Sequence, residues 1–207
     1  MAVRRDMLEK SLAVLAAASL KPKIVDDSPL ALLRTFTADS LAGTIVLADI
    51  SNGLTTLLLA ANGIPRFARV IPHSLQYISQ ELHVELPQVL EAMQQASSAM
   101  EPGGDAGFGN SMPVEWGVTL AREIRSSIGY YLAQNTDSVV DRVVLSGRGA
   151  RVNDLPEILQ DELGVAVEII NPLAKVKVTA KLPSVNLEQE GPDFAVCIGL
   201  ALRGLEA

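Results

Sequence analysis

The spacing of apolar residues at the start of the chain predicts two helices and then a three-strand meander. Apolar positions recur at helical intervals over residues 4–19, and a second helix over 29–36 has a proline in its first turn. Between the two helices, a short apolar stretch indicates a strand over 23–26. Three apolar runs follow, separated by the hairpin signals Asn52-Gly53 and Asn62-Gly63, and these runs predict strands over 44–50, 54–60 and 64–70.

The middle of the chain changes to a helical pattern. Two short amphipathic helices are predicted after residue 73, and the glycine-rich stretch 101–112 predicts a flexible loop. One long helix follows, because apolar residues form a stripe at helical spacing through Trp116, Leu120, Ile124, Ile128 and Leu132. We interpret this stripe, Trp116 included, as core packing.

The last third of the chain has a βαβ pattern. A buried strand over 139–145, a glycine-bearing turn and a helix over 155–163 are followed by an alternating strand over 165–169. Residues 194–205 are apolar nearly all round, which predicts a helix buried on several sides and a buried Cys197.

Charge and composition exclude several classes of function. The chain has 207 residues, with 17 basic and 24 acidic side chains and a net charge of −7. Nucleic acid and anionic lipid both require clustered Lys and Arg, so we predict neither partner. One cysteine and two distant histidines cannot form a structural zinc site, and no phosphate-binding GxxxxGK or GxGxxG motif stands between a strand and a helix.

The N-terminal segment allows two interpretations. Arg4-Arg5 ahead of an apolar run resembles a twin-arginine export signal. Asp6 and Glu9 place negative charge before that run, which favours an ordinary amphipathic helix. Elsewhere, no apolar run approaches the ~20 residues that a membrane-spanning helix needs, so direct membrane insertion is not expected.

Two turns could carry chemistry. Asp49 ends an apolar strand and is followed by Ser51, Asn52 and Gly53. A hairpin of this kind can aim backbone N–H groups at a phosphate while the carboxylate organises a metal-bound water. The same residues are also common in hairpins that bind nothing.

The second turn contains Ser146, Gly147, Arg148 and Gly149 between a strand and a helix. This arrangement lets a ligand approach the backbone near a helix N-terminus, although glycines also serve tight turns that bind no ligand. Two such turns separated by a helical insertion are typical of the nucleotide-binding lobe of actin-type ATPases.

A family resemblance rests on short segments that follow one another along nearly the whole chain: 20–26, 30–36, 46–50, 62–69, 123–132, 143–150, 155–159, 163–168, 171–172, 192–195 and 199–202. Together they resemble the PilM family, FtsA-like proteins of type IV pilus assembly with an actin fold. The resemblance implies an α/β, ribonuclease H-like fold: a mixed sheet that forms the second actin-like lobe, with a helical subdomain inserted at about 74–135. Residues 39–207 are expected to form this lobe and 1–38 to be the remnant of a first lobe that is mostly absent, which leaves open whether Met1 is the native start.

The resemblance also implies a function. A PilM-like protein is expected to be a cytoplasmic scaffold that docks to the cytoplasmic tail of an inner-membrane, PilN-like pilus protein and stays peripheral to the membrane through that partner. The alternative is an ATP-binding protein or slow ATPase of the same fold, using ATP and Mg²⁺; an unrelated α/β enzyme or an exported protein are remaining possibilities.

The candidate nucleotide-binding residues are those of the two turns, and Asp49 would contact Mg²⁺ indirectly through water: Asp49, Ser51, Asn52, Gly53, Ser146, Gly147, Arg148 and Gly149. The family pattern has Asp-x-Gly in the first turn and consecutive glycines in the second. Here Ser51 and Arg148 stand at those positions, where a Cβ and a long cation would crowd the nucleotide. We therefore expect nucleotide binding to be weak or lost, and we assign no catalytic residue.

Overall fold

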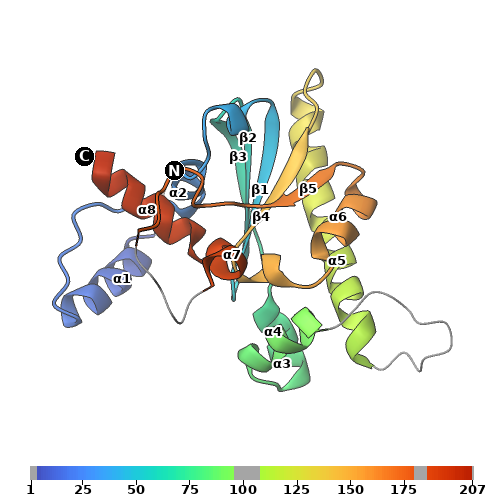
Figure 1. The fold of residues 1–207 in the computed structure, drawn as a ribbon, viewed down its shortest axis with the longest axis horizontal. Coiled ribbons are helices and arrows are strands. Elements are labelled where there is room, and N and C mark those ends of the chain that lie inside the picture. Colours follow the sequence, from blue (N-terminus) through green and yellow to red (C-terminus); the bar gives the residue numbers. More distant parts are fainter. Residues whose placement is uncertain (1–3, 96–107, 180–185, 207) are drawn as a thin grey trace.

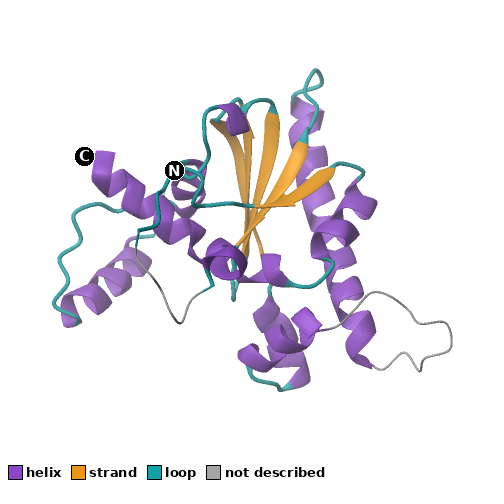
Figure 2. Ribbon diagram, in the orientation of Figure 1, coloured by secondary structure: helices purple, strands orange, loops and turns teal. Residues whose placement is uncertain are grey.

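The computed structural model describes residues 4–95, 108–179 and 186–206. Its centre is a mixed five-stranded sheet with helices on both faces (Figures 1 and 2). The strand order is β3-β2-β1-β4-β5. The first three strands form an antiparallel meander, and the last two run parallel to β1: β1 (Thr44–Ile50), β2 (Thr55–Ala61), β3 (Ile64–Ile71), β4 (Arg142–Ser146) and β5 (Ala166–Ile169). The meander and the place of the 139–145 segment in the same sheet are confirmed, and the structure shows that β4 of this segment pairs in parallel with β1.

Helices cover both faces of β1, which explains the apolar run from Ile45 to Ala48. On one face, α2 (Ser28–Leu33) and α8 (Ala195–Glu206) pack against Ile45 and Leu47. On the other face, α5 (Phe108–Gln134) and α6 (Leu155–Leu163) pack against Val46 and Ala48 (Figure 1). Because successive side chains of a strand point to opposite faces, a strand covered on both sides carries apolar residues at consecutive positions, here Ile45 to Ala48.

The remaining helical elements lie beyond these two layers. The helices α3 (Leu75–Leu82) and α4 (Leu86–Gln95) form a small unit below the sheet in Figure 1, as the periodicity after residue 73 predicted. The first helix, α1 (Arg5–Ala17), has no buried residue. Short elements complete the described chain: η1 (Asp39–Leu41), η2 (Arg148–Arg151), α7 (Leu187–Glu190) and η3 (Gly191–Phe194). In the described residues, no helix is both long and apolar enough to cross a membrane.

Three local predictions are wrong. Residues 23–26 form no strand, and Ile24 and Val25 are exposed, because no neighbouring strand is there to pair with them. Residues 108–112 belong to α5 rather than to a loop, while the rest of the predicted loop, 101–107, lies outside the described residues. Cys197 is exposed, since α8 is covered on only part of its circumference.

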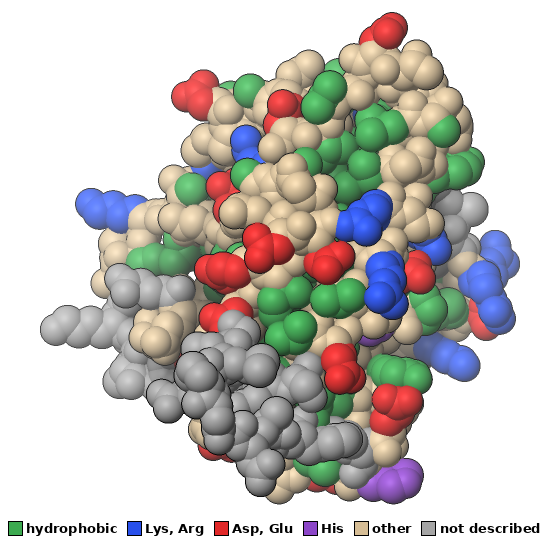
Figure 3. Space-filling view, turned by 90° about the vertical axis from the view of Figure 1, so that its right-hand side faces the viewer, with side chains coloured by type: hydrophobic (Ala, Val, Ile, Leu, Met, Phe, Trp, Pro, Cys, Tyr) green, Lys and Arg blue, Asp and Glu red, His purple; other side chains and the backbone are tan. Residues whose placement is uncertain are grey.

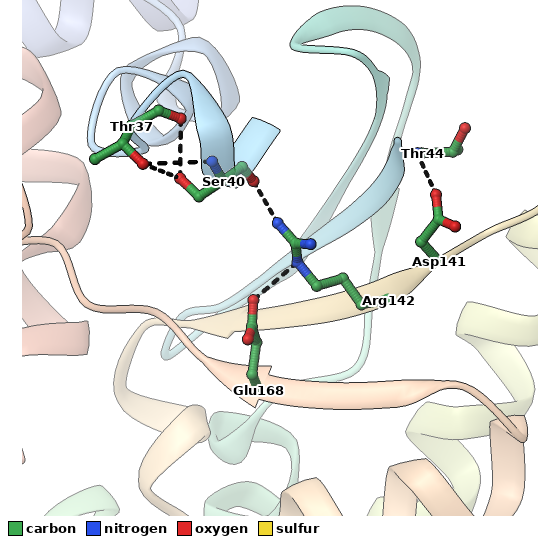
Figure 4. Close-up of polar contacts among 6 residues, drawn as sticks. All are labelled: Thr37, Ser40, Thr44, Asp141, Arg142 and Glu168. Atoms are coloured by element: carbon green, nitrogen blue, oxygen red, sulfur yellow. Dashed lines mark hydrogen bonds and ion pairs between the residues drawn. The ribbon is translucent and has the colours of Figure 1, made fainter. Parts of the chain in front are cut away.

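Polar contacts fix the register of β4 between its neighbours (Figure 4). The guanidinium of Arg142 donates to the carbonyl of Ser40, and its Nε lies 2.9 Å from Oε1 of Glu168 on β5. One residue earlier, Oδ2 of Asp141 accepts the backbone N–H of Thr44 at 2.7 Å. These contacts connect η1, β1, β4 and β5 at the end of the sheet opposite the candidate site described below.

The two edges of the sheet differ in construction. The strand β3 forms one edge, contains Pro65 and two arginines, and pairs with β2 through a register shift at Leu59/Ala60. The strand β5 forms the other edge and is only four residues long.

Candidate functional site

The two turns singled out in the sequence meet at one end of the sheet. Because β1 and β4 are adjacent and parallel, Asp49 lies opposite Ser146, and the turns that follow them are neighbours. They border an open hollow of about 530 Å³, whose walls include six of the eight predicted residues: Asp49, Ser51, Asn52, Gly53, Gly147 and Arg148. Ser146 and Gly149 are buried behind the wall. A crevice beyond the carboxyl ends of parallel strands is where α/β proteins commonly bind ligands.

Asp49 is the most buried acid of this hollow, with 6% of its surface exposed. Burial raises the pKa of Asp49 above its usual value, because desolvation disfavours the charged carboxylate. The hydroxyl of Ser51 donates to Oδ2 of Asp49 at 3.1 Å and opposes this rise. The hydroxyl of Ser146 acts in the same direction, but its buried Oγ has no hydrogen bond of ordinary geometry among the described residues, so we assign the main opposing contact to Ser51.

The glycines of the second turn are required by the protein's own packing. Gly147 has φ +79°, and a Cβ there would lie 2.7 Å from the carbonyl oxygen of Ile50. A Cβ at Gly149 would lie 2.2 Å from Cγ2 of Ile50. The turn therefore needs glycine in order to pass over the end of β1, whether or not a ligand binds. The N–H of Gly147 is also occupied, since it donates to the carbonyl of Pro192 at 3.0 Å.

An acid that the sequence analysis left without a role completes the hollow. Asp193 lies in its wall, and its Oδ2 is 3.6 Å from Nε of Arg148 and 3.1 Å from Nη1 of Arg151. Its other oxygen, Oδ1, is buried and accepts no hydrogen bond within the part of the chain that the structure describes. Ser28 and Thr56 also border the hollow. The only available signal for Asp193 was its place in a segment of the family resemblance.

These contacts meet the needs of a nucleotide only in part. Within the described residues, the N–H groups of Asn52 and Gly53 donate to no protein acceptor, so a phosphate could accept from them. Against this, the Ser51 hydroxyl already donates to one oxygen of the Asp49 carboxylate. The side chain of Arg148 also lines the hollow, beside Asp193. The described residues contain no group of three or more His, Cys, Asp or Glu that could hold a metal.

Comparison with solved structures identifies the fold. The chain is similar to MreB5 of Spiroplasma citri bound to AMPPNP, with a TM-score of 0.63 and 11% identity over 99% of this chain and 66% of that one. It is also similar to an archaeal actin homolog, with a TM-score of 0.56 and 15% identity over 89% of this chain and 56% of that one. At these identities the likeness concerns the fold alone, and it defines the protein as an α/β protein of the actin-like class.

A closer match identifies the family. The chain is similar to a chain of a PilM–PilN type IV pilus biogenesis complex, with a TM-score of 0.80 and 28% identity over 99% of its own length. The family model for the type IV pilus assembly protein PilM matches residues 1–205. The chain therefore belongs to the PilM family, as the sequence segments predicted. It spans 60% of the length of the PilM chain that it matches.

Proposed function

We propose that the chain is a cytoplasmic scaffold of type IV pilus assembly, which docks to the cytoplasmic tail of an inner-membrane, PilN-like protein and binds nucleotide weakly or not at all. The observation that carries this proposal is the match, at 28% identity, to a chain whose structure was solved in a PilM–PilN complex. We further propose that residues 39–207 form the second actin-like lobe and that 1–38 belong to the first.

Docking is tested with the partner's own tail. The probe is a fluorescent peptide with the cytoplasmic tail sequence of the PilN-like protein from the same genome. Its fluorescence anisotropy is expected to rise when this chain is added, whereas the anisotropy of a scrambled peptide is not. The groove for such a tail is expected mainly in the first lobe. Peptide binding depends on a few well-buried anchors, so we expect this chain to bind at least about tenfold more weakly than the same chain joined to a complete first lobe. Equal affinities for the two proteins would contradict this placement of the groove.

Nucleotide binding is expected to be weak because donors that would face the ligand are already in use. The N–H of Gly147 donates to Pro192, and the hydroxyl of Ser51 donates to Asp49. The contacts that remain must offset the cost of ordering a highly charged ligand. We expect calorimetry with Mg-ATP to give a dissociation constant weaker than about 100 μM, which is less than about 5.5 kcal/mol of binding free energy. A low-micromolar constant with one-to-one stoichiometry would contradict this.

A variant that restores the family pattern tests whether the side chains of Ser51 and Arg148 are the cause of weak nucleotide binding. The double substitution Ser51→Gly with Arg148→Gly removes the hydroxyl from Asp49 and the guanidinium from the hollow. We expect it to tighten Mg-ATP binding at least about fivefold, which is roughly 1 kcal/mol. Asp49→Ala in the same background should abolish this gain, since the carboxylate would no longer orient the metal-bound water.

The alternative function, a slow ATPase of the same fold, is favoured by one observation. Asn52 and Gly53, whose N–H groups donate to no acceptor among the described residues, line the same hollow as the buried Asp49. Phosphate release from Mg-ATP, measured with purified protein, distinguishes the two functions. Turnover that Asp49→Ala abolishes would favour the ATPase over the scaffold.

A further inference from the structure

The outer side of α8 is an apolar surface that no described part of the chain covers. Its inner side packs against α2. Between residues 194 and 205, the exposed positions lie on one side of the helix and carry no charge: Phe194, Cys197, Leu200, Ala201, Gly204 and Leu205. We call these six residues the α8 stripe. A helix that is apolar nearly all round is normally buried nearly all round, so the stripe indicates a neighbour from outside the described chain.

The stripe differs from an ordinary exposed surface. On the opposite side of the molecule, where α5 and α6 lie, acidic and basic side chains are spread among the apolar ones (Figures 1 and 3). The stripe has no such charges, and its large side chains are well exposed: Phe194 by 38%, Leu200 by 43% and Leu205 by 84%. Single exposed hydrophobic residues are common on protein surfaces, but a contiguous row without charges is typical of an interface.

A hollow of about 610 Å³ borders the stripe, between α8 and the segment 23–26. Leu200 and Gly204 of the stripe line this hollow, and its other lining residues are Lys23, Ile24, Asp26 and Arg203. The hollow shares no lining residue with the one at Asp49. A Cβ at Gly204 would meet no atom within 4 Å, so the position leaves room for a side chain of another molecule.

The stripe is complementary to itself. Phe194 ends η3 directly before α8, and Phe194 and Gly204 lie equally far from Gly199 along the chain, as do Cys197 and Ala201. Two copies of α8 that pair antiparallel about a two-fold axis at the level of Gly199 therefore place Phe194 of one copy opposite Gly204 of the other. Cys197 then lies opposite Ala201. Large side chains face small ones, which lets two helices approach closely, and the two-fold axis makes each contact occur twice.

The hollow is also suited to an aromatic ring. Ile24 and Leu200 give it apolar walls for the ring of Phe194 from a second copy. The side chain of Arg203 is 38% exposed, and its ion pair with the buried Asp26 holds the guanidinium in place. Guanidinium groups attract the faces of aromatic rings, so Arg203 would add to the apolar contacts.

We propose that the α8 stripe is a dimer interface, at which two copies of this chain pair antiparallel and Phe194 of each copy enters the hollow beside α8 of the other. A second copy fits better than an unrelated partner because one face carries both the exposed ring and the open position that receives it. The interface is small, since α8 has 12 residues and stable complexes usually bury about 800 Å² on each partner. The dimer is therefore weak, with a dissociation constant of about 10–100 μM.

Sedimentation velocity tests the association directly. The average mass is expected to rise from 22.0 kDa towards twice that value as the protein concentration increases. The rise should stop at two copies, because an interface with a two-fold axis closes there. The range from about 5 μM to 1 mM covers the expected dissociation constant. A mass that stays at 22.0 kDa throughout this range would overturn the proposal and leave the stripe to a partner of different sequence.

Two variants place the association on the stripe. Leu205→Glu puts a charge into the apolar contact, and Phe194→Ala removes the ring from the hollow. Each is expected to weaken dimerisation at least about tenfold. Because Leu205 is 84% exposed, Leu205→Glu should leave the melting temperature of dilute protein unchanged. Val139→Glu is the matched control, since it exchanges a side chain that is 72% exposed, away from α8, for the same charge and should leave dimerisation unchanged.

Disulfide trapping tests the antiparallel arrangement. Cys197 is the only cysteine of the chain, and Ala201→Cys places a second thiol opposite Cys197 of the other copy. Oxidation with copper phenanthroline should convert most of this variant into a covalent dimer. Ser126→Cys, at an exposed position of α5, is the control and should give at least about tenfold less dimer. Dimerisation that Leu205→Glu and Phe194→Ala leave unchanged, or a dimer that Ala201→Cys fails to trap, would overturn the proposal.

Discussion

Replacing Gly199 with alanine is expected to lower the free energy of unfolding by about 3 kcal/mol, at the upper end of the usual cost of overpacking. Gly199 lies where α8 crosses α2, and a Cβ there would stand 1.9 Å from the carbonyl oxygen of Ala31. The obstructing atoms belong to the backbone of α2, so no side-chain rotation can make room. For a chain of this length the loss corresponds to a melting temperature lower by about 6–12 °C.

The same helix supplies the matched control for this substitution. A Cβ at Gly204 meets no atom within 4 Å. Gly204→Ala is therefore expected to leave stability unchanged or to raise it by up to about 1 kcal/mol, because alanine favours the helix more than glycine does. Thermal unfolding followed by circular dichroism measures both variants. Similar melting temperatures for the two would show that α8 can move away from α2 at little cost.

Replacing Asp26 with asparagine is the second substitution with a large expected effect, a loss of about 3 kcal/mol at pH 7. The Asp26 side chain is 3% exposed and forms ion pairs with Arg34, at the end of α2, and Arg203 of α8. Burial on its own would raise the pKa of Asp26, but the hydrogen bonds from Arg203 and Arg34 outweigh it and lower the pKa from 3.8 to about 2. The substitution leaves two partly exposed guanidinium groups without the buried anion that they share.

The pH dependence of this loss has a definite sign. Since the folded protein holds the pKa of Asp26 below its unfolded value, the stabilisation is fully present above pH 3.8 and is lost as the pH falls through about 2. Urea unfolding of both proteins should therefore show a constant difference from pH 7 to 5 that shrinks below pH 3.8. Asp6→Asn serves as the control, because Asp6 pairs with Arg4 in an exposed position and should cost less than about 1 kcal/mol. A difference that grew on acidification would contradict this assignment.

The sequence predicted those parts of the fold that local pattern determines. The meander follows from apolar runs and Asn-Gly turns that lie close together in the chain. Both strands that precede the two turns were predicted in one sheet, and the structure adds that β1 and β4 are adjacent and parallel, which brings Asp49 and the 146–149 turn together. These features depend on residues near one another or on one pairing between strands, so a single sequence is sufficient to find them.

Features that depend on distant partners escaped prediction. A strand over 23–26 had the right composition, but a strand exists only where another can pair with it. Residues 139–141 were assigned to β4, which begins at Arg142, and Val139 is 72% exposed. Asp193 enters the hollow because η3 passes beside η2, and nothing local to residue 193 indicates that position.

The construction of the two sheet edges has a consequence for self-association. An exposed strand edge can pair with a second copy of the same chain and so begin aggregation. The proline, the arginines and the register shift along β3 interrupt the regular row of donors and acceptors that such pairing needs, and β5 is too short to offer a long row. Both edges of the sheet therefore work against the growth of concentrated protein into continuous intermolecular sheets.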